Sequence, residues 1–246
     1  MLKKYILQIV VLLSILVTIL INSLANILPI NGYTTGELSD DIPIFFVPAG
    51  YVFAIWGLIY VSQIFYAIYT FFNYSETDKK IFPYILITCV ANCSWILLWH
   101  YKHVSLSVLA MIVLLLSLIL IYQKVSKNGY PLIKSFMFRL YLGWVSVASI
   151  ANIAATLSLT TWDRFGIREE MWSAGMIGVA TILALLTLNI KKDYIYPLVI
   201  IWAVVGILVK FFNTSDLVAG ASVVSIIVIL GSIFTKIYTS KYRKEE

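Results

Sequence analysis

The sequence carries little charge: only 12% of its 246 residues are Asp, Glu, Lys or Arg, whereas 61% are hydrophobic. Soluble globular domains are usually about 45–50% apolar, so this composition excludes an ordinary soluble domain. The few charged residues cluster between long apolar runs. The composition therefore predicts an integral membrane protein whose immediate partner is the lipid bilayer.

Cysteine is also scarce, with Cys89 and Cys93 four residues apart in one apolar run. A buried thiol behaves as a small hydrophobic side chain, and metal binding would need further ligands nearby. No such ligands are visible in the sequence around the two cysteines. We therefore expect both cysteines to be packing residues, and we expect neither a metal site nor a required cofactor.

The apolar runs hold almost no acidic or basic residues near their centres. Carboxylate relays mark proton pumps and arginine-rich helices mark voltage sensors, so both of these classes are disfavoured. The runs also show no nucleophile–base pair and no paired carboxylates. We therefore expect a protein that is not an enzyme.

Eight apolar runs are long enough to cross about 30 Å of hydrocarbon, which takes roughly 20 helical residues. None has the alternating pattern of a barrel strand. A short break separates the third run from the fourth, which predicts a tight helical hairpin. The sequence thus predicts an all-α, polytopic helical bundle with spans at 5–28, 47–72, 81–99, 104–123, 136–159, 171–190, 194–212 and 217–238.

The positions of the basic residues predict the orientation, because cytoplasmic loops are enriched in Lys and Arg. With the amino terminus inside, all but four of the 18 basic residues fall on the inner side, and the exceptions are Lys102, Arg164, Arg168 and Lys210. We therefore expect a multi-pass protein of the plasma membrane with both termini in the cytoplasm. The net charge of +6 follows from this asymmetry, so we expect no nucleic-acid partner.

The first span has a second interpretation. Ser23 and Ala25 have the small-residue spacing of a signal-peptidase site, and cleavage after Ala25 would leave seven spans. The apolar stretch of about 20 residues is longer than the 7–15 residues of a signal peptide, which favours an uncleaved span.

Two asparagines lie within the spans, where a polar side chain must find a partner. Tyr141, Trp144, Ala148 and Asn152 share one face of the fifth span. Asn92 shares a face with Trp95 and Trp99 in the third span, and Phe53, Trp56 and Tyr60 share one in the second. Counting 1.5 Å per residue from the outer ends puts Trp56, Asn92 and Asn152 at a similar depth.

This shared depth has two interpretations. Aromatic rings with a few amides are typical of a ligand pocket, here one open toward the outer half of the bilayer. Alternatively, the asparagines clamp helices together and the tryptophans fill volume. Elsewhere, His100 and His103 are expected to be interfacial residues, and Glu37, Asp40 and Asp41 to be solvated loop acids.

The stretch "VPAGYVFAIWGLIY" resembles the entry to the second helix of the TspO/MBR family, the translocator proteins or tryptophan-rich sensory proteins. Asn92 and Trp95 match the family's third-helix Asn-x-x-Trp motif. Tyr141, Trp144, Ala148 and Asn152 match its fifth-helix motif in type and spacing. The chain departs from the family pattern at Ala49 and Tyr51, where the family has Pro and Trp, and at Leu140, where it has Pro. It also adds about three helices to the family's five.

The resemblance implies a five-helix core over residues 1–160, with three additional helices in 161–246 packed on it. It also implies an aromatic pocket for a hydrophobic or amphipathic small molecule, such as a porphyrin or haem-like tetrapyrrole, serving sensing or transport. A secondary transporter or permease of another small solute is the alternative, and a homo-oligomer is compatible with both. The expected ligand-binding residues are Tyr51, Phe53, Trp56, Tyr60, Asn92, Trp95, Trp99, Tyr141, Trp144, Ala148 and Asn152.

Overall fold

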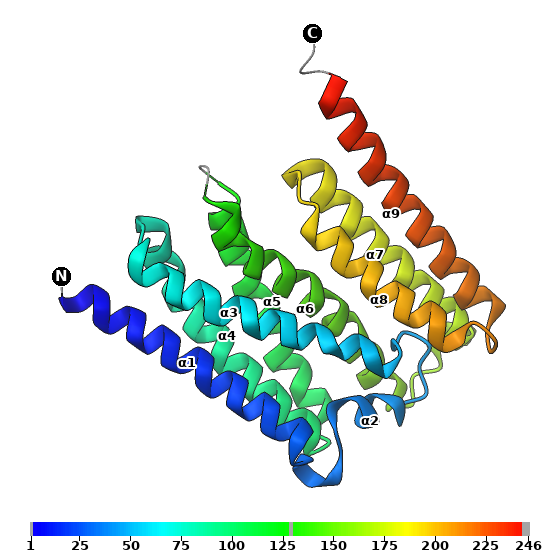
Figure 1. Ribbon diagram of the computed structural model, residues 1–246. Helices are drawn as coiled ribbons and strands as arrows, with labels where there is room; N and C mark the ends of the chain where they lie inside the picture. The colour runs from blue at the N-terminus through cyan, green and yellow to red at the C-terminus, as the bar shows by residue number, and fades with distance from the viewer. Residues whose placement is uncertain (1, 128–129, 243–246) are drawn as a thin grey trace. The chain divides into compact units, whose positions relative to one another are not determined.

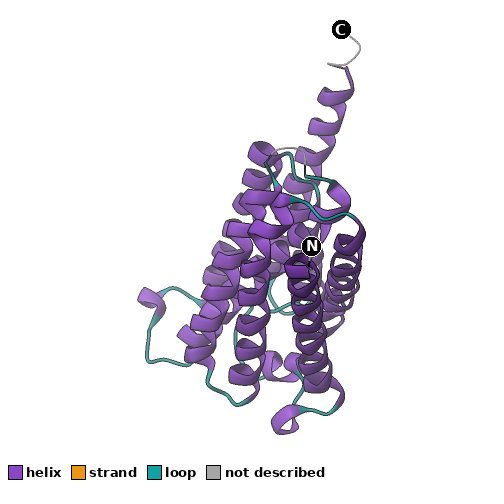
Figure 2. Cartoon of the chain, turned by 90° about the vertical axis from the view of Figure 1, so that its left-hand side faces the viewer, coloured by secondary structure: helices purple, strands orange, loops and turns teal. Residues whose placement is uncertain are grey.

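A computed structural model describes residues 2–127 and 130–242 (Figure 1). The described residues form helices joined by loops, with no strand among them (Figure 2). This confirms the predicted all-α class. The α-helices are α1 (Leu2–Ile27), α2 (Thr35–Asp40), α3 (Ile55–Phe72), α4 (Glu76–His100), α5 (Val104–Val125), α6 (Leu132–Ser158), α7 (Glu169–Lys191), α8 (Ile195–Phe211) and α9 (Asp216–Tyr242).

Each of the eight predicted spans corresponds to one of these helices, with α2 as the additional element. Within the part of the chain that the structure describes, seven helical segments are long and apolar enough to cross a membrane, and they correspond to α1, α3, α4, α5, α6, α7 and α9. The eighth, α8, is apolar but has only 17 residues. At 1.5 Å per residue it is about 25 Å long, at the lower limit for a transmembrane helix.

Capping explains where two of the helices begin. Ser75 accepts a hydrogen bond from the Asp78 N–H while the Asp78 side chain accepts one from the Ser75 N–H, so α4 begins at Glu76, five residues before the predicted start of its span. Thr34 and Glu37 form the same reciprocal capping box at α2, a short helix that hydropathy did not predict. This contact lowers the pKa of Glu37, chiefly because the carboxylate accepts the Thr34 backbone N–H. The predicted hairpin is confirmed, since α4 ends at His100 and α5 begins at Val104.

The chain divides into two compact units. The first contains the residues up to Pro43 and Phe53–Leu159, and therefore α1 to α6. The second contains Ile44–Val52 and the residues from Thr160 onward, with α7, α8 and α9. The segment Ile44–Val52 thus belongs with the carboxyl-terminal helices, whereas the sequence assigned it to the amino-terminal core. Arg243 and Lys244, which count toward the predicted inner charge, lie outside the described residues.

A buried ion pair joins the predicted inner ends of α4 and α6 in the first unit. Lys134 Nζ lies 2.7 Å from Asp78 Oδ2, and the two side chains are 3% and 0% exposed. Asp78 also accepts hydrogen bonds from the hydroxyls of Tyr66, Tyr130 and Ser75. Burial and the bond to Asp78 raise the pKa of Tyr130. Both residues lie just outside the predicted spans 81–99 and 136–159, and the sequence did not predict that they pair.

Candidate functional site

The candidate site is a cluster of aromatic rings from three helices of the first unit. Trp56 and Tyr60 are one turn apart on α3, Trp95 and Trp99 are one turn apart on α4, and Trp144 follows Tyr141 on α6. Residues three or four apart lie on the same face of a helix, so each helix presents its rings together. The structure shows that these three faces meet.

Trp56 is the centre of the cluster. Its ring stacks on Tyr60 and Trp95, with centroids 5.6 and 6.4 Å away. It meets Tyr141 and Trp144 edge-to-face at 5.8 and 6.3 Å. Aromatic pairs at these distances contribute roughly 0.5–1.5 kcal/mol each beyond their buried area. The helix faces that the sequence placed at one depth therefore do converge.

Two further rings extend the cluster. Phe53 lies in a 3-10 helix, Gly50–Ala54, that leads into α3, and its ring meets Trp144 edge-to-face at 5.8 Å. Trp99 stacks on Trp95 at 6.1 Å. The cluster thus comprises seven rings: Phe53, Trp56, Tyr60, Trp95, Trp99, Tyr141 and Trp144.

Asn152 is bonded to the rim of this cluster. Its Oδ1 accepts the indole N–H of Trp95 at 3.2 Å, and its Nδ2 donates to Ser107 Oγ at 3.0 Å. Because Ser107 belongs to α5, a single side chain joins α4, α5 and α6. Asn152 therefore acts as a helix clamp, and it orients the Trp95 ring as well.

Asn92, one turn before Trp95 on α4, has a similar role. Its Nδ2 donates to the Tyr141 hydroxyl at 3.0 Å, and its Oδ1 accepts from Asn22 Nδ2 at 2.6 Å. Asn92 is fully buried and Asn22 is 3% exposed. Asn22 on α1 is therefore a further residue of this hydrogen-bonded group.

Two buried indole N–H groups in the cluster have no hydrogen-bond partner among the described residues. They belong to Trp99 and Trp144, which are 6% and 3% exposed. Leaving a buried donor unpaired costs about 1–3 kcal/mol. The cluster thus offers two donors to an acceptor that the protein itself does not supply.

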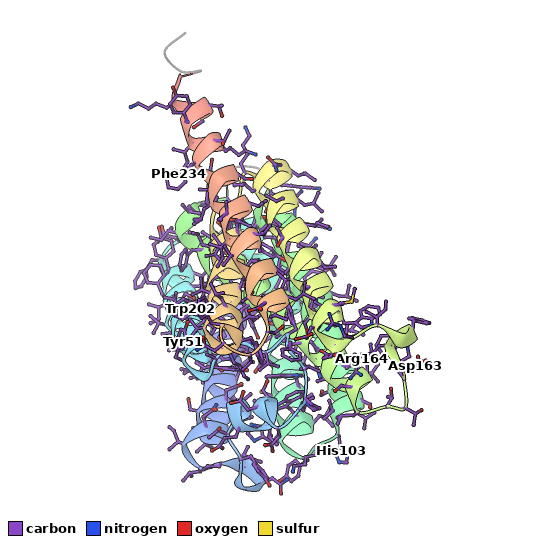
Figure 3. The ribbon with its side chains drawn as sticks, turned by 90° about the vertical axis from the view of Figure 1, so that its right-hand side faces the viewer. Tyr51, His103, Asp163, Arg164, Trp202 and Phe234 are labelled. Atoms are coloured by element: carbon purple, nitrogen blue, oxygen red, sulfur yellow. The ribbon has the colours of Figure 1, made fainter. Side chains whose placement is uncertain are left out.

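The remaining predicted site residues lie elsewhere. Ala148 is half-buried on α6, one turn from both Trp144 and Asn152. Tyr51, predicted at the pocket mouth, belongs to the second unit, where its ring meets Trp202 of α8 edge-to-face at 5.6 Å (Figure 3). The predicted aromatic group therefore includes one ring that the structure assigns to the other unit.

Two apolar grooves lie on the first unit, and the seven rings line neither of them. One, of about 480 Å³, runs between α1 and α4 past Thr18, Cys93 and Leu97. The other, of about 450 Å³, runs between α4 and α5 past Val90, Ser94 and Ala110. The rings themselves pack against one another.

His100 is not interfacial, which corrects the sequence interpretation. It is fully buried, with Nε2 at 3.1 Å from Thr35 Oγ1 and Nδ1 at 3.2 Å from the Ile30 carbonyl. It ties the segment between α1 and α2 to the end of α4. No group of three or more His, Cys, Asp and Glu side chains within 2–127 and 130–242 could hold a metal ion.

The chain is similar in sequence to a known family. A family model described as TSPO-like protein matches residues 8–235. The chain belongs to this TSPO-like protein family. The match covers α7, α8 and most of α9, so the relationship extends well beyond the motifs in residues 1–160. Comparisons with curated proteins and with solved structures found no match. Its apolar helices and its family together make this TSPO-like chain an integral membrane protein.

Proposed function

We propose that this TSPO-like protein binds a flat hydrophobic or amphipathic molecule of the tetrapyrrole class at the seven-ring cluster of the first unit. A porphyrin is a broad apolar plate with carboxylates at its edge. Such a plate is well suited to stacking on Trp56 and Trp95, whose rings are already 28° from parallel. The family relationship supports the same class of ligand.

The observation that carries the proposal is the pair of unpaired indole donors. A site built only for packing would leave few buried donors without partners. Carboxylate or pyrrole acceptors on a ligand would pair with the N–H groups of Trp99 and Trp144. Gln63 adds a buried carbonyl without a partner one turn after Tyr60 on the same helix, and this oxygen could accept a ligand N–H.

Binding requires the rings to separate, because they are in contact in the ligand-free protein. Asn92 and Asn152 each join α4 to α6, by way of Tyr141 and Trp95, so the rings of α3 separate from those of α4 and α6 most easily. Ligand binding should therefore change the tryptophan fluorescence strongly.

The test is a titration of purified protein with protoporphyrin IX, followed by quenching of tryptophan fluorescence and by the shift of the porphyrin absorbance band. The double variant Trp56→Phe, Asn152→Leu should weaken binding at least about tenfold, since it loses the central ring and the Trp95 partner. Trp162→Phe, in the second unit, is the matched control and should bind normally. Equal affinity in all three proteins would overturn the assignment of the site.

A flux measurement distinguishes a sensing role from a transport role. If the protein moves its ligand, proteoliposomes will accumulate porphyrin faster than empty liposomes, and the double variant will not. Flux of a different small solute with no porphyrin binding would instead support the alternative, a secondary permease.

We also propose that the protein resides in the plasma membrane with both termini in the cytoplasm, on the strength of the basic residues concentrated on one side. A tag at either terminus should be digested by protease in inverted vesicles and protected in intact cells. Protection of one tag and digestion of the other in the same preparation would contradict this topology.

A further inference from the structure

Residues 44–52, here termed the strap, belong to the second unit although the chain enters the strap from the first unit and returns to it. Several of its side chains are deeply buried, although Gly50 and Tyr51 are exposed: Phe46 is 1% exposed, Val47 2% and Val52 fully buried. A nine-residue connection between two elements normally lies on the surface. The burial of this connection indicates a specific docking site.

Backbone hydrogen bonds attach the strap to α8. The Ala49 N–H donates to the Gly206 carbonyl at 3.1 Å. The indole N–H of Trp202 donates to the Val52 carbonyl at 3.0 Å. Both bonds use backbone groups of the strap, so they restrain its backbone conformation directly.

Ring contacts reinforce these bonds at both ends of the strap. Tyr51 meets Trp202 edge-to-face, and the two labelled side chains lie side by side in Figure 3. Phe45 packs on Phe211 with centroids 5.0 Å apart, and its N–H donates to Glu169 Oε1 at 3.4 Å.

Gly206 makes this close approach possible. A Cβ built there would lie 2.2 Å from Val52 Cγ2 and 2.9 Å from Pro48 Cβ, so no larger residue fits without moving the strap. Gly178 on α7 and Gly220 on α9 have open space at the same position. The glycine on α8 therefore has a packing role that these two lack.

We propose that α8 is a dock for the strap, and that Trp202 and Gly206 are positioning residues for the aromatic cluster of the first unit. The connection is covalent: Val52, held by Trp202, is followed directly by Phe53, whose ring contacts Trp144. Val52 and Phe53 are neighbours in the 3-10 helix Gly50–Ala54, so a restrained Val52 carbonyl also restrains the backbone from which the Phe53 ring extends. The carboxyl-terminal helices thereby contribute to the arrangement of rings that they do not themselves supply.

The first experiment is hydrogen–deuterium exchange of the intact protein in lipid nanodiscs, comparing Gly206→Ala with Gly178→Ala. Gly206→Ala should speed exchange about tenfold or more in peptides covering both 44–52 and 53–60, while Gly178→Ala leaves them unchanged. Adding Val52→Ala to Gly206→Ala should restore slow exchange in part, because it removes the clashing Cγ2 atom. Unchanged exchange in the strap would overturn the dock. Faster exchange confined to 44–52 would overturn the positioning role.

A second pair of variants covers the case in which Gly206→Ala does not fold. Trp202→Phe keeps an aromatic ring against Tyr51 and removes only the donor to Val52. Trp172→Phe is its match, because the Trp172 indole also donates to a backbone carbonyl, that of Arg164, at 3.1 Å. Exchange in residues 50–60 should increase in Trp202→Phe alone; equal profiles for the two variants would count against the proposal.

Ligand binding gives a further test of the positioning role, and this test rests on the proposed function. Protoporphyrin IX should bind Gly206→Ala at least about fivefold more weakly than Gly178→Ala, with the loss reversed in part by Val52→Ala. Equal affinities would overturn the positioning role. If protoporphyrin IX does not bind the unaltered protein, the proposed function fails, and the exchange experiments still decide the dock independently.

Discussion

At the scale of single residues, Trp95 and Trp99 stand one turn apart on α4 and stack on each other, yet their indole N–H groups differ. Trp95 donates to Asn152, whereas Trp99 has no partner among the described residues. Changing either residue to Phe removes a similar volume from the cluster. The difference between the two variants therefore reports the Asn152 hydrogen bond together with the Trp56 stacking contact that Trp95 makes.

We predict that Trp95→Phe lowers the free energy of unfolding by about 1 kcal/mol more than Trp99→Phe in the ligand-free protein. Trp95→Phe leaves the Asn152 carbonyl with one donor fewer, and Trp99→Phe removes a donor that was already unpaired. Unfolding in a graded mixture of mild and denaturing detergents would measure both. A larger loss for Trp99→Phe would show that its donor is bonded after all.

The sequence predicted which helix faces meet, but not the hydrogen bonds between them. Helical spacing brought Trp56, Asn92 and Asn152 together correctly, because in a membrane helix depth and facing direction both follow from residue number. The same reasoning could not find Ser107 or Asn22 as partners. Those pairings depend on how the helices rotate against one another, which a single sequence does not encode locally.

At the scale of elements, the network around Asp78 fastens α3, α4 and α6 together. Removing one member of a buried ion pair leaves the other charge without compensation, which typically costs 3–5 kcal/mol. We predict a loss of about that size for Lys134→Met, measured by the same detergent unfolding. The double variant with Asp78→Asn should be less damaging than Lys134→Met alone, because no unpaired charge then remains.

The matched control is Lys79→Met. Lys79 lies 3.8 Å from Glu76 in an ion pair whose side chains are 64% and 76% exposed. Exposed pairs contribute roughly 0–1 kcal/mol, so this variant should be nearly neutral. Similar losses in the free energy of unfolding for Lys79→Met and Lys134→Met would contradict the prediction, because they would show that water compensates the charge of Asp78.

Element ends were the least predictable part of the fold. Hydropathy placed the start of the third span at residue 81, but the charged first turn of α4 is helical from Glu76 because Ser75 and Asp78 cap it. A hydropathy profile does not distinguish a charged loop from the charged first turn of a helix. A capping box with Ser at the N-cap and an acidic residue three positions later is the signal that identifies such a turn.

At the scale of the whole molecule, the two units differ in how far the sequence predicted them. The motifs located the first unit, but they extended it through residues 44–52, which the structure groups with the carboxyl-terminal helices. Continuity along the chain favoured that assignment. The contacts of Gly206 and Trp202, which are separated from the strap by about 150 residues, decided against it.

Whether both termini share one side depends on α8, the shortest of the apolar helices. If its 17 residues cross the bilayer, residues 191 and 213 lie on opposite sides; otherwise they lie on the same side. We expect α8 to cross, because it carries no charge before Lys210 and because about 25 Å suffices when the flanking Lys side chains extend to the headgroups.

Single cysteines in a Cys89→Ala, Cys93→Ala background test this directly. Lys191→Cys and Asn213→Cys are exposed positions on either side of α8, with Lys80→Cys and His103→Cys as references for the inner and outer surfaces. A membrane-impermeant maleimide applied to intact cells should label positions 213 and 103, and leave 191 and 80 unlabelled until the cells are opened. If position 213, like 191, is labelled only after the cells are opened, α8 lies within one leaflet. The carboxyl terminus would then lie on the outer side, because only seven helices would cross.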